Sequence, residues 1–417
     1  MIRGHLAPGI LGVFGQRLVD TGQLRPPSAL TRAQINTSVT ALGADGVTWA
    51  SFAANVPRFT GTGQRLLIGG QRTNSVRNPR GESATVGTIG SGGAMPTNYS
   101  LNAGGLAVDI VATGTTNGVS WVRYRAHGTS TSTALIITFD TTFAIPASAS
   151  QTWSGSWFYR LVDAPLPPLS HFTRISSRDS GGAALANGSV AFTPTATFQR
   201  FDRAQALSSS GSTAYVTFAY STSNTTGAAY DWTFEIGWPQ IELGAFASTP
   251  ILPSIGTPAA STRGADSLAI GLRNFLPSAT GTLLMSGVAP VLSGSHTLLQ
   301  LHAGSDANRF LVVASGTALS LQRSLAGASA SVAAGNLVAG QVFRLALSVN
   351  AAGRAAMSLN GAAAVAVTGG PTSGLATILL GSQLGGAAAL HGEVSHLSTL
   401  PHVAADAALP GLANGIP

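Results

Sequence analysis

The chain has 417 residues, of which 44% are hydrophobic and only 9% are charged. Ordinary soluble domains carry about 25% charged residues, so we expect much of this surface to contact other protein, in a homo-oligomer or a larger particle. Cysteine is absent, which excludes disulfides and thiolate metal sites. No segment approaches the ~18–20 continuous apolar residues of a membrane span, so no membrane span is predicted.

The N-terminal region carries the whole excess of positive charge. Residues 1–80 hold nine arginines and two acidic residues, whereas the rest of the chain holds thirteen of each. A local basic segment on a neutral body indicates docking to an acidic protein partner, and not a broad nucleic-acid surface. A solvated basic arm without a partner is the alternative. The arginines expected to dock are Arg3, Arg17, Arg25 and Arg32.

Residues 1–65 are predicted to form an irregular, basic attachment segment. Its apolar runs are too short and too often broken by Gly and Pro for a secretion signal, so we expect synthesis in a cytoplasm. Residues 66–248 contain short runs rich in β-branched and aromatic residues between Gly, Ser, Asn and Pro clusters, for example 155–162 and 230–238. Many short strands at even spacing indicate an antiparallel sandwich or jelly roll.

Residues 249–264 form a proline-rich connector, with three prolines between positions 250 and 258, and are expected to be stiff. Residues 265–417 lack Trp and Tyr and are predicted to form a second set of strands. Segments 281–287 and 296–302 are expected to pair with each other, and 350–353 and 360–361 are predicted hairpin turns. The predicted fold is all-β, with two tandem antiparallel jelly-roll or β-sandwich domains after the attachment segment.

Several of these segments resemble known families. Residues 238–251 (WPQIELGAFASTPI) and 260–266 (ASTRGAD) resemble a junction in phage and prophage fibre proteins, and residues 66–74 (LLIGGQRTN) resemble the segment that opens the preceding sandwich. That sandwich is similar to a carbohydrate-binding module. Residues 343–350 (FRLALSVN) and 357–361 (MSLNG) resemble a concanavalin A-like (laminin G-type) jelly roll.

The resemblance implies an accessory protein on the surface of a virion or gene-transfer particle, a tail fibre or head spike made in the bacterial cytoplasm. It implies attachment to host capsular or cell-surface polysaccharide, and contact with other virion proteins through the N-terminal segment. Such proteins are usually symmetric homo-oligomers, so a trimer is the default and a pentamer would suit a capsid vertex. The alternative is a structural head-decoration, tail or baseplate protein without a ligand.

Catalysis is not expected, and neither is a cofactor. Glycoside hydrolysis needs two carboxylates placed across one sugar bond, and after residue 264 the only acidic residues are Asp266, Asp306, Glu393 and Asp406. None are two or three positions apart, so a polysaccharide-degrading enzyme is the least favoured function. Asp306 with Asn308 could ligate Ca²⁺, but an ordinary turn is the favoured interpretation, and no metal site is predicted.

Sugar binding needs flat aromatic faces beside polar side chains, and residues 66–248 contain both. By alternation, Trp157 and Tyr159 share one strand face and Phe158 the other, and Trp232 is predicted to lie in the core. The alternative for each aromatic residue is that it packs in the core and binds no sugar. The alternative for the arginines is that they lie on a solvated strand face without a ligand. The predicted carbohydrate-binding residues are Trp121, Arg123, Arg125, Trp153, Trp157 and Tyr159.

Overall fold

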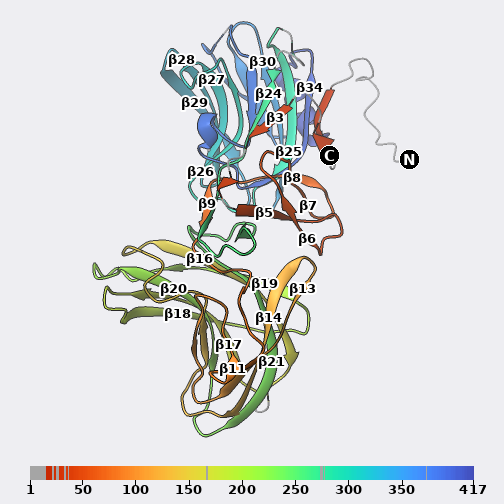
Figure 1. The fold of residues 1–417 in the computed structure, drawn as a ribbon. Coiled ribbons are helices and arrows are strands. Elements are labelled where there is room, and N and C mark those ends of the chain that lie inside the picture. Colours follow the sequence, from red (N-terminus) through yellow and green to blue (C-terminus); the bar gives the residue numbers. More distant parts are fainter. Residues whose placement is uncertain are drawn as a thin grey trace.

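The computed structural model describes residues 16–20, 23–24, 28–31, 34–35, 37–165, 168–272, 276, 278–371 and 373–417. Strands make up nearly all of the regular structure, which confirms the predicted all-β class. Two sandwiches lie one above the other with a band of short strands between them (Figure 1). Among the described helices, none is long and apolar enough to cross a membrane.

The lower sandwich in Figure 1 comprises residues 75–249 and is called the aromatic sandwich here. Its seven-stranded sheet contains, in spatial order, β11 (Gly92–Gly93), β10 (Gly87–Ile89), β13 (Ala107–Thr116), β14 (Val119–Thr129), β21 (Ala229–Leu243), β16 (Thr152–Asp163) and β19 (Gln199–Ala206). Its five-stranded sheet contains β12 (Ser100–Asn102), β15 (Ile136–Thr138), β20 (Tyr215–Ser223), β17 (Ser170–Arg178) and β18 (Ala184–Phe192).

The core of the aromatic sandwich follows from period-two alternation along its strands. In β14, Val122, Tyr124 and Ala126 are buried, while the residues between them lie on the outer face. Trp157 is fully buried and meets Tyr220 of the opposite sheet, with ring centroids 5.4 Å apart. Burial of apolar surface at about 25 cal/mol per Å² makes these rings the main source of stability in this sandwich.

The upper sandwich is called the C-terminal sandwich. Its larger sheet contains β2 (Gln23–Leu24), β1 (Gln16–Asp20), β34 (Gly392–Leu400), β25 (Gly281–Val288), β30 (Val342–Val349), β31 (Ala355–Leu359) and β32 (Val365–Val367), with β8 (Arg65–Ile68) paired to β34 and β7 (Phe59–Thr60) paired to β8. Its second sheet contains β29 (Ala328–Asn336), β28 (Ala318–Leu325), β27 (Arg309–Ser315), β26 (Ser295–His302), β33 (Thr377–Leu380), β24 (Ser267–Gly271) and β3 (Ser28–Thr31). The short helices are η2 (Leu384–Gly386), η3 (Asp406–Ala408) and α1 (Leu409–Asn414).

The predicted turns and one predicted pairing have different outcomes. The turn at 350–353 joins β30 to β31 and the turn at 360–361 joins β31 to β32, as predicted. Asn360 and Gly361 have φ angles of 50° and 77°, the left-handed conformation that an Asn-Gly turn supplies. The expected pairing of 281–287 with 296–302 is wrong, because β25 and β26 lie in opposite sheets.

The N-terminal strands belong to the C-terminal sandwich. β1 and β8 pair with one edge of β34, and β3 pairs with β24. Val19, Leu66 and Ile68 are buried in the same core as the C-terminal strands. The prediction of an irregular segment 1–65 is therefore wrong for β1 and β3, and β8 belongs to this sandwich and not to the one predicted to begin at residue 66. Without these strands, β34 and β24 would leave unpaired edges and open the apolar core.

The aromatic sandwich is consequently an insertion in the C-terminal sandwich, and not the first of two tandem domains. Its two ends run through the band of short strands between the sandwiches (Figure 1). There β5 (Thr37–Leu42) lies between β22 (Ile251–Pro253) and β6 (Trp49–Phe52). Likewise β23 (Ser261–Arg263) lies between β4 (Gln34–Ile35) and β9 (Arg72–Asn74). The predicted connector 249–264 is thus held by strand pairing with N-terminal residues.

A buried ion pair holds this junction. Arg58 Nη2 donates to Asp266 Oδ2 at 2.7 Å, and both side chains are almost completely buried. Asp266 Oδ2 also accepts the Gly69 backbone N–H at 2.8 Å, while Arg263 Nη2 donates to the Gly70 carbonyl at 2.8 Å. We call Arg58, Arg263 and Asp266 the junction clamp. It explains the 260–266 segment physically, because its Arg and Asp hold residues 58 and 69–70, which lie about 200 positions earlier in the chain.

Candidate functional site

Strand β14 brings three of the six predicted residues together. Trp121, Arg123 and Arg125 alternate with core residues and lie on the outer face of the seven-stranded sheet. Trp121 and Arg123 are half-buried and Arg125 is exposed. The centre of the Arg123 guanidinium lies 5.1 Å from the centre of the Trp121 ring. These three residues therefore form one surface, which is the predicted arrangement.

The other three predicted residues lie in the core. Trp153, Trp157 and Tyr159 are 5%, 0% and 0% exposed. The Trp157 indole N–H donates to Thr173 Oγ1 at 3.1 Å, so even its polar atom is satisfied inside the sandwich. The alternation predicted for β16 is correct, since Phe158 faces the other way. The chosen face was wrong, because rings as large as these fill the space between two sheets better than smaller side chains do.

A glycine on a neighbouring strand gives the Trp121 ring its position. Trp121 is opposite Gly114 of β13 and Gly237 of β21. A Cβ at Gly114 would lie only 2.5 Å from Trp121 Cζ2, so the ring occupies space that any other residue at position 114 would fill. Thr116 Oγ1 accepts a hydrogen bond from the indole N–H at 2.9 Å. The ring is thus fixed in place before any ligand arrives.

Trp121 forms part of a hollow of about 330 Å³, which we call the Trp121 hollow. Two arms of backbone border it, one from β13 and β14 and one from residues 80–84. Ser120 Oγ donates to the Arg80 carbonyl at 3.3 Å, and the Glu82 carboxylate accepts the Gly256 N–H at 3.0 Å. The lining residues are Arg80, Gly81, Glu82, Ser83, Ala84, Thr113, Gly114, Thr115, Ser120 and Trp121.

The arginines on this outer face are neutralised by carboxylates on neighbouring strands. Glu235 is fully buried and accepts from Arg123 Nη2 at 2.6 Å and from Arg160 Nη2 at 2.7 Å. Arg125 makes a two-pronged ion pair with Asp231 at 2.8 and 2.6 Å. Arg123 and Arg125 were predicted to meet an acidic polysaccharide. Arg125 has a carboxylate of its own, whereas Arg123 shares Glu235 with Arg160, so these three guanidinium groups and two carboxylates leave one positive charge.

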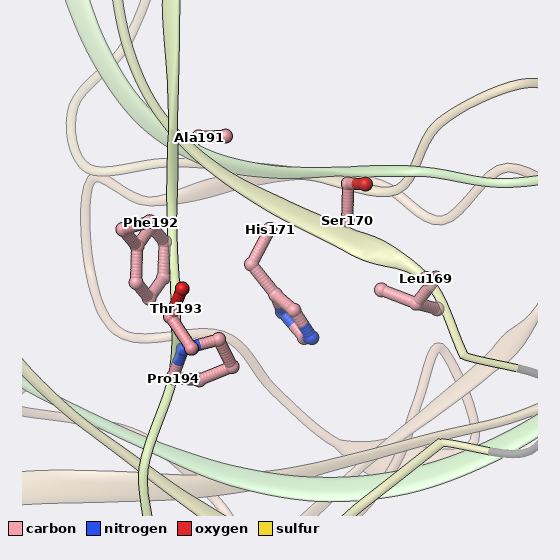
Figure 2. Close-up of a pocket in the computed structure, with 7 residues that line it drawn as sticks. All are labelled: Leu169, Ser170, His171, Ala191, Phe192, Thr193 and Pro194. Carbon is pink, nitrogen blue, oxygen red and sulfur yellow. The ribbon is translucent and has the colours of Figure 1, made fainter.

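A second hollow, of about 340 Å³, opens at the end of the sandwich where β17 begins and β18 ends. Figure 2 shows the His171 ring projecting between Phe192 and Leu169, with Thr193 and Pro194 beside it. His171 Nδ1 lies 2.8 Å from the Tyr220 hydroxyl and 3.4 Å from the Tyr159 hydroxyl. Tyr159, a predicted sugar platform, therefore lies behind this hollow and contacts one of its walls.

Burial lowers the pKa of His171 to about 4, so the imidazole is neutral near pH 7. The pKa of His391, in the junction, is lowered to about 3 by burial and by the nearby charges of Arg72 and Arg263. Both histidines are therefore hydrogen-bonding groups of the folded core at neutral pH and not proton donors. Among the described residues there is no group of three or more His, Asp or Glu side chains placed to hold a metal ion. Asp306 contacts Gln300 and Arg309.

The side chains of the four predicted docking arginines lie outside the described part of the structure. Arg3, Arg25 and Arg32 lie outside the described residues, and of Arg17 only the backbone in β1 is described. Their docking role stays a prediction.

One row of residues was missed by the sequence reasoning. Phe172, Arg174, Ser176 and Arg178 alternate along β17 with the buried residues between them and lie on the outer face of the five-stranded sheet. The period-two pattern F-x-R-x-S-x-R was visible in the sequence and would have indicated a shared face.

No protein-family model matches the chain, and no curated protein sequence matches it significantly. Among solved structures, it is similar to the CBM40 domain of a Ruminococcus gnavus IT-sialidase bound to α2,3-sialyllactose, with 15% identity over 32% of this chain and 82% of that chain, at a TM-score of 0.27. The tandem CBM22 domains of Paenibacillus barcinonensis Xyn10C share 11% identity over 77% of this chain and 99% of that chain, at a TM-score of 0.26. Domains LG4-5 of the mouse laminin α1 chain share 11% identity over 69% and 89%, at 0.25. At these TM-scores, the likeness bears on neither ligand nor activity.

Proposed function

We propose that this protein binds carbohydrate through the outer-face surface of Trp121, Arg123 and Arg125. The observation that carries the proposal is the pre-positioned indole of Trp121 on the outer sheet face, with the Arg123 guanidinium beside it. Pyranose rings present C–H groups that pack on aromatic faces and hydroxyls that need donors and acceptors beside them. The outer face supplies the ring of Trp121 and, beside it, the guanidinium groups of Arg123 and Arg125. The exposed hydroxyls of Thr113 and Thr115 are opposite Val122 and Ser120 and so lie on the other face of these strands.

The protein works as a binding module and not as an enzyme. Of the acidic side chains on and beside this face, Glu235 and Asp231 pair with arginines, Glu82 accepts the Gly256 amide, and Asp109 accepts from Thr88 and contacts His127. A hydrolase needs one carboxylate that can give up a proton and another opposite it. The hydrogen bond from Arg125 lowers the pKa of Asp231, so this carboxylate is a poor proton donor.

In its wider role, the protein is an accessory spike or fibre of a phage, prophage or gene-transfer particle that attaches the particle to host surface polysaccharide. Support comes from the fibre-like segments 66–74, 238–251 and 260–266 and from the basic N-terminal region. Assembly would be a homo-oligomer, by default a trimer, held on the virion by contacts that include Arg3, Arg17, Arg25 and Arg32. A structural head, tail or baseplate protein without a ligand is the competing function.

Replacing Trp121 by Ala tests the binding proposal. On an array of bacterial capsular and cell-surface polysaccharides, the full-length protein is expected to bind a restricted set, and Trp121→Ala to weaken that binding about tenfold. A stacked aromatic group contributes about 0.5–1.5 kcal/mol, which corresponds to up to about tenfold in affinity. Trp121→Phe should retain part of the binding. A blank array with folded protein, or equal binding by Trp121→Ala, refutes the proposal.

The virion role predicts where the protein is found. Particles purified from a producing culture are expected to contain the chain, and labelled antibody should decorate their exterior. Substituting Arg3, Arg17, Arg25 and Arg32 together with Gln is expected to reduce incorporation severalfold while circular dichroism stays unchanged. A chain buried inside a closed shell, or full incorporation of the fourfold variant, would argue for the structural alternative or against the docking segment.

A further inference from the structure

The outer face of the five-stranded sheet carries two arginines in one row of β17. Arg174 is opposite Ala219 of β20 and Ser189 of β18, and Arg178 is opposite Tyr215. The strand rise of about 3.3 Å per residue places the two backbone positions about 13 Å apart. The neighbours of Arg174 are small, so its guanidinium stands above them.

These two arginines differ in charge balance from Arg123, Arg125 and Arg160 of the other sheet and resemble Arg200 and Arg203 of β19, which bond neutral groups. In the described residues, no carboxylate lies within ion-pair distance of Arg174 or Arg178, whereas Arg123, Arg125 and Arg160 each pair with one. The pKa of Arg174 is lowered by burial and by the positive charge of Arg178, which places two like charges near each other. The adjacent Asp179 uses Oδ1 to accept the Gly181 and Ala183 amides of the following turn. This face is therefore positively charged without internal compensation.

Both guanidinium groups are anchored by neutral partners. Arg174 donates from Nε to Ser176 Oγ at 3.1 Å and from Nη2 to Asn187 Oδ1 at 2.6 Å. Arg178 donates from Nε to Thr217 Oγ1 at 3.3 Å and from Nη1 to the Gly182 carbonyl at 3.0 Å. No hydrogen bond to a described residue involves Arg174 Nη1 or Arg178 Nη2. Each group is thus oriented with N–H donors left over for a ligand.

Aromatic side chains lie at both ends of the row. Phe172 is two residues before Arg174 on the same face and is half-buried. At the other end, the Tyr215 ring meets Phe143 edge to face, with centroids 5.4 Å apart, and Phe143 is 55% exposed. Between them Ser176 and Thr217 are buried and accept hydrogen bonds from the two guanidinium groups. The face therefore combines apolar ring surfaces with two cations.

We propose that this β17 face is a second glycan-binding site, specific for polysaccharides that carry carboxylates, the uronic-acid class. The inference rests on the proposed glycan-binding function but uses a different sheet and different residues. The planar guanidinium fork matches the planar carboxylate and binds it in two-pronged geometry. The aromatic rings pack on the sugar faces between the carboxylates. Arg174 is anchored on Ser176 and Arg178 on Thr217, which is opposite Ser176, so the two guanidinium groups converge on one part of the strand and suit a polymer that carries several carboxylates.

The test compares two probes with the same backbone, polygalacturonate oligomers and their fully methyl-esterified form. By isothermal titration at low salt, the full-length protein is expected to bind the free acid at least tenfold more tightly than the ester. Raising NaCl should weaken binding of the acid, because charge attraction is screened. Arg174→Gln combined with Arg178→Gln is expected to reduce affinity for the acid at least tenfold. Arg323→Gln, which changes a half-buried arginine of the C-terminal sandwich that donates to backbone carbonyls, should leave it unchanged.

The outcomes separate this inference from the Trp121 proposal. Trp121→Ala is expected to retain polygalacturonate binding, so loss in that variant alone leaves the first proposal standing and overturns the second site. Equal binding of acid and ester, or unchanged binding by the double Arg variant, also overturns it. Equally tight, Arg174-dependent binding of a sulfated glycan or of single-stranded DNA would show a general polyanion surface and refute the uronate assignment. Circular dichroism of each variant confirms that the chain is folded.

Discussion

A fragment that begins at residue 249 is expected not to fold, although it contains the whole of the predicted second domain. It lacks β1, β3 and β8, which pair with β34 and β24, and it lacks the buried side chains of Val19, Leu66 and Ile68. Loss of each large aliphatic group from a core costs about 2–5 kcal/mol, and whole domains are stable by only about 5–15 kcal/mol. The fragment should show no cooperative thermal transition by circular dichroism and poor dispersion in NMR spectra.

The matched control joins residues 16–74 to 250–417 through a short Gly-Ser linker in place of the aromatic sandwich. The ends to be joined lie close together, since Asn74 Nδ2 is 3.0 Å from the Ile251 carbonyl oxygen. This chain is expected to melt cooperatively, as is the excised aromatic sandwich 75–249. Cooperative folding of 249–417 alone would restore the tandem arrangement and contradict the insertion.

Replacing Asp266 by Ala is expected to lower the free energy of unfolding by about 3–5 kcal/mol. The change leaves the buried guanidinium of Arg58 without its carboxylate and the Gly69 amide without its acceptor. Removing one partner of a buried ion pair has this cost because an uncompensated charge remains in the core. Urea denaturation followed by circular dichroism measures the loss.

Asp231→Ala is the matched control. The Asp231–Arg125 distance of 2.6 Å is close to the 2.7 Å of Asp266–Arg58, but both side chains of the control pair are about half exposed. Exposed pairs contribute about 0–1 kcal/mol, so this variant should unfold almost like the original protein. Equal losses in the two variants would mean that the junction clamp does not hold the two sandwiches together. All six Trp lie before residue 249. Indole fluorescence therefore reports unfolding of the aromatic sandwich and the junction, whereas circular dichroism reports both sandwiches.

The sequence was sufficient for the all-β class, the Asn-Gly turn and the alternation within individual strands, because these depend on neighbouring residues. It was not sufficient for which strand pairs with which. Leu66 and Ile68 alternate as a strand, but nothing near them in the chain shows that their partner is β34, more than 320 residues away. The insertion is set by such long-range pairing, which composition boundaries do not reveal.

Three of the six predicted carbohydrate-binding residues lie together on one surface, and the other three lie in the core. Alternation correctly placed Trp121, Arg123 and Arg125 on one face, but alternation gives two faces without saying which is inside. Trp157 and Tyr159 lie on the inner face, where their rings contact the ring of Tyr220 across the sandwich. The compensation of Arg123 by Glu235 was equally hidden, because the two residues are on different strands. The shared face of Arg174 and Arg178 could have been predicted from their spacing in the sequence. The absence of a carboxylate opposite them, among the described residues, could not.

The central claim, that Trp121 contacts bound glycan, is tested most directly by ¹⁹F NMR of the full-length protein labelled with 5-fluorotryptophan. The six Trp give one resonance each, and Trp121→Phe assigns the one that matters. When the polysaccharide that binds best on the array is added, the Trp121 resonance is expected to shift while those of the buried Trp157 and Trp232 stay in place. Binding that leaves the Trp121 resonance unmoved would contradict the account.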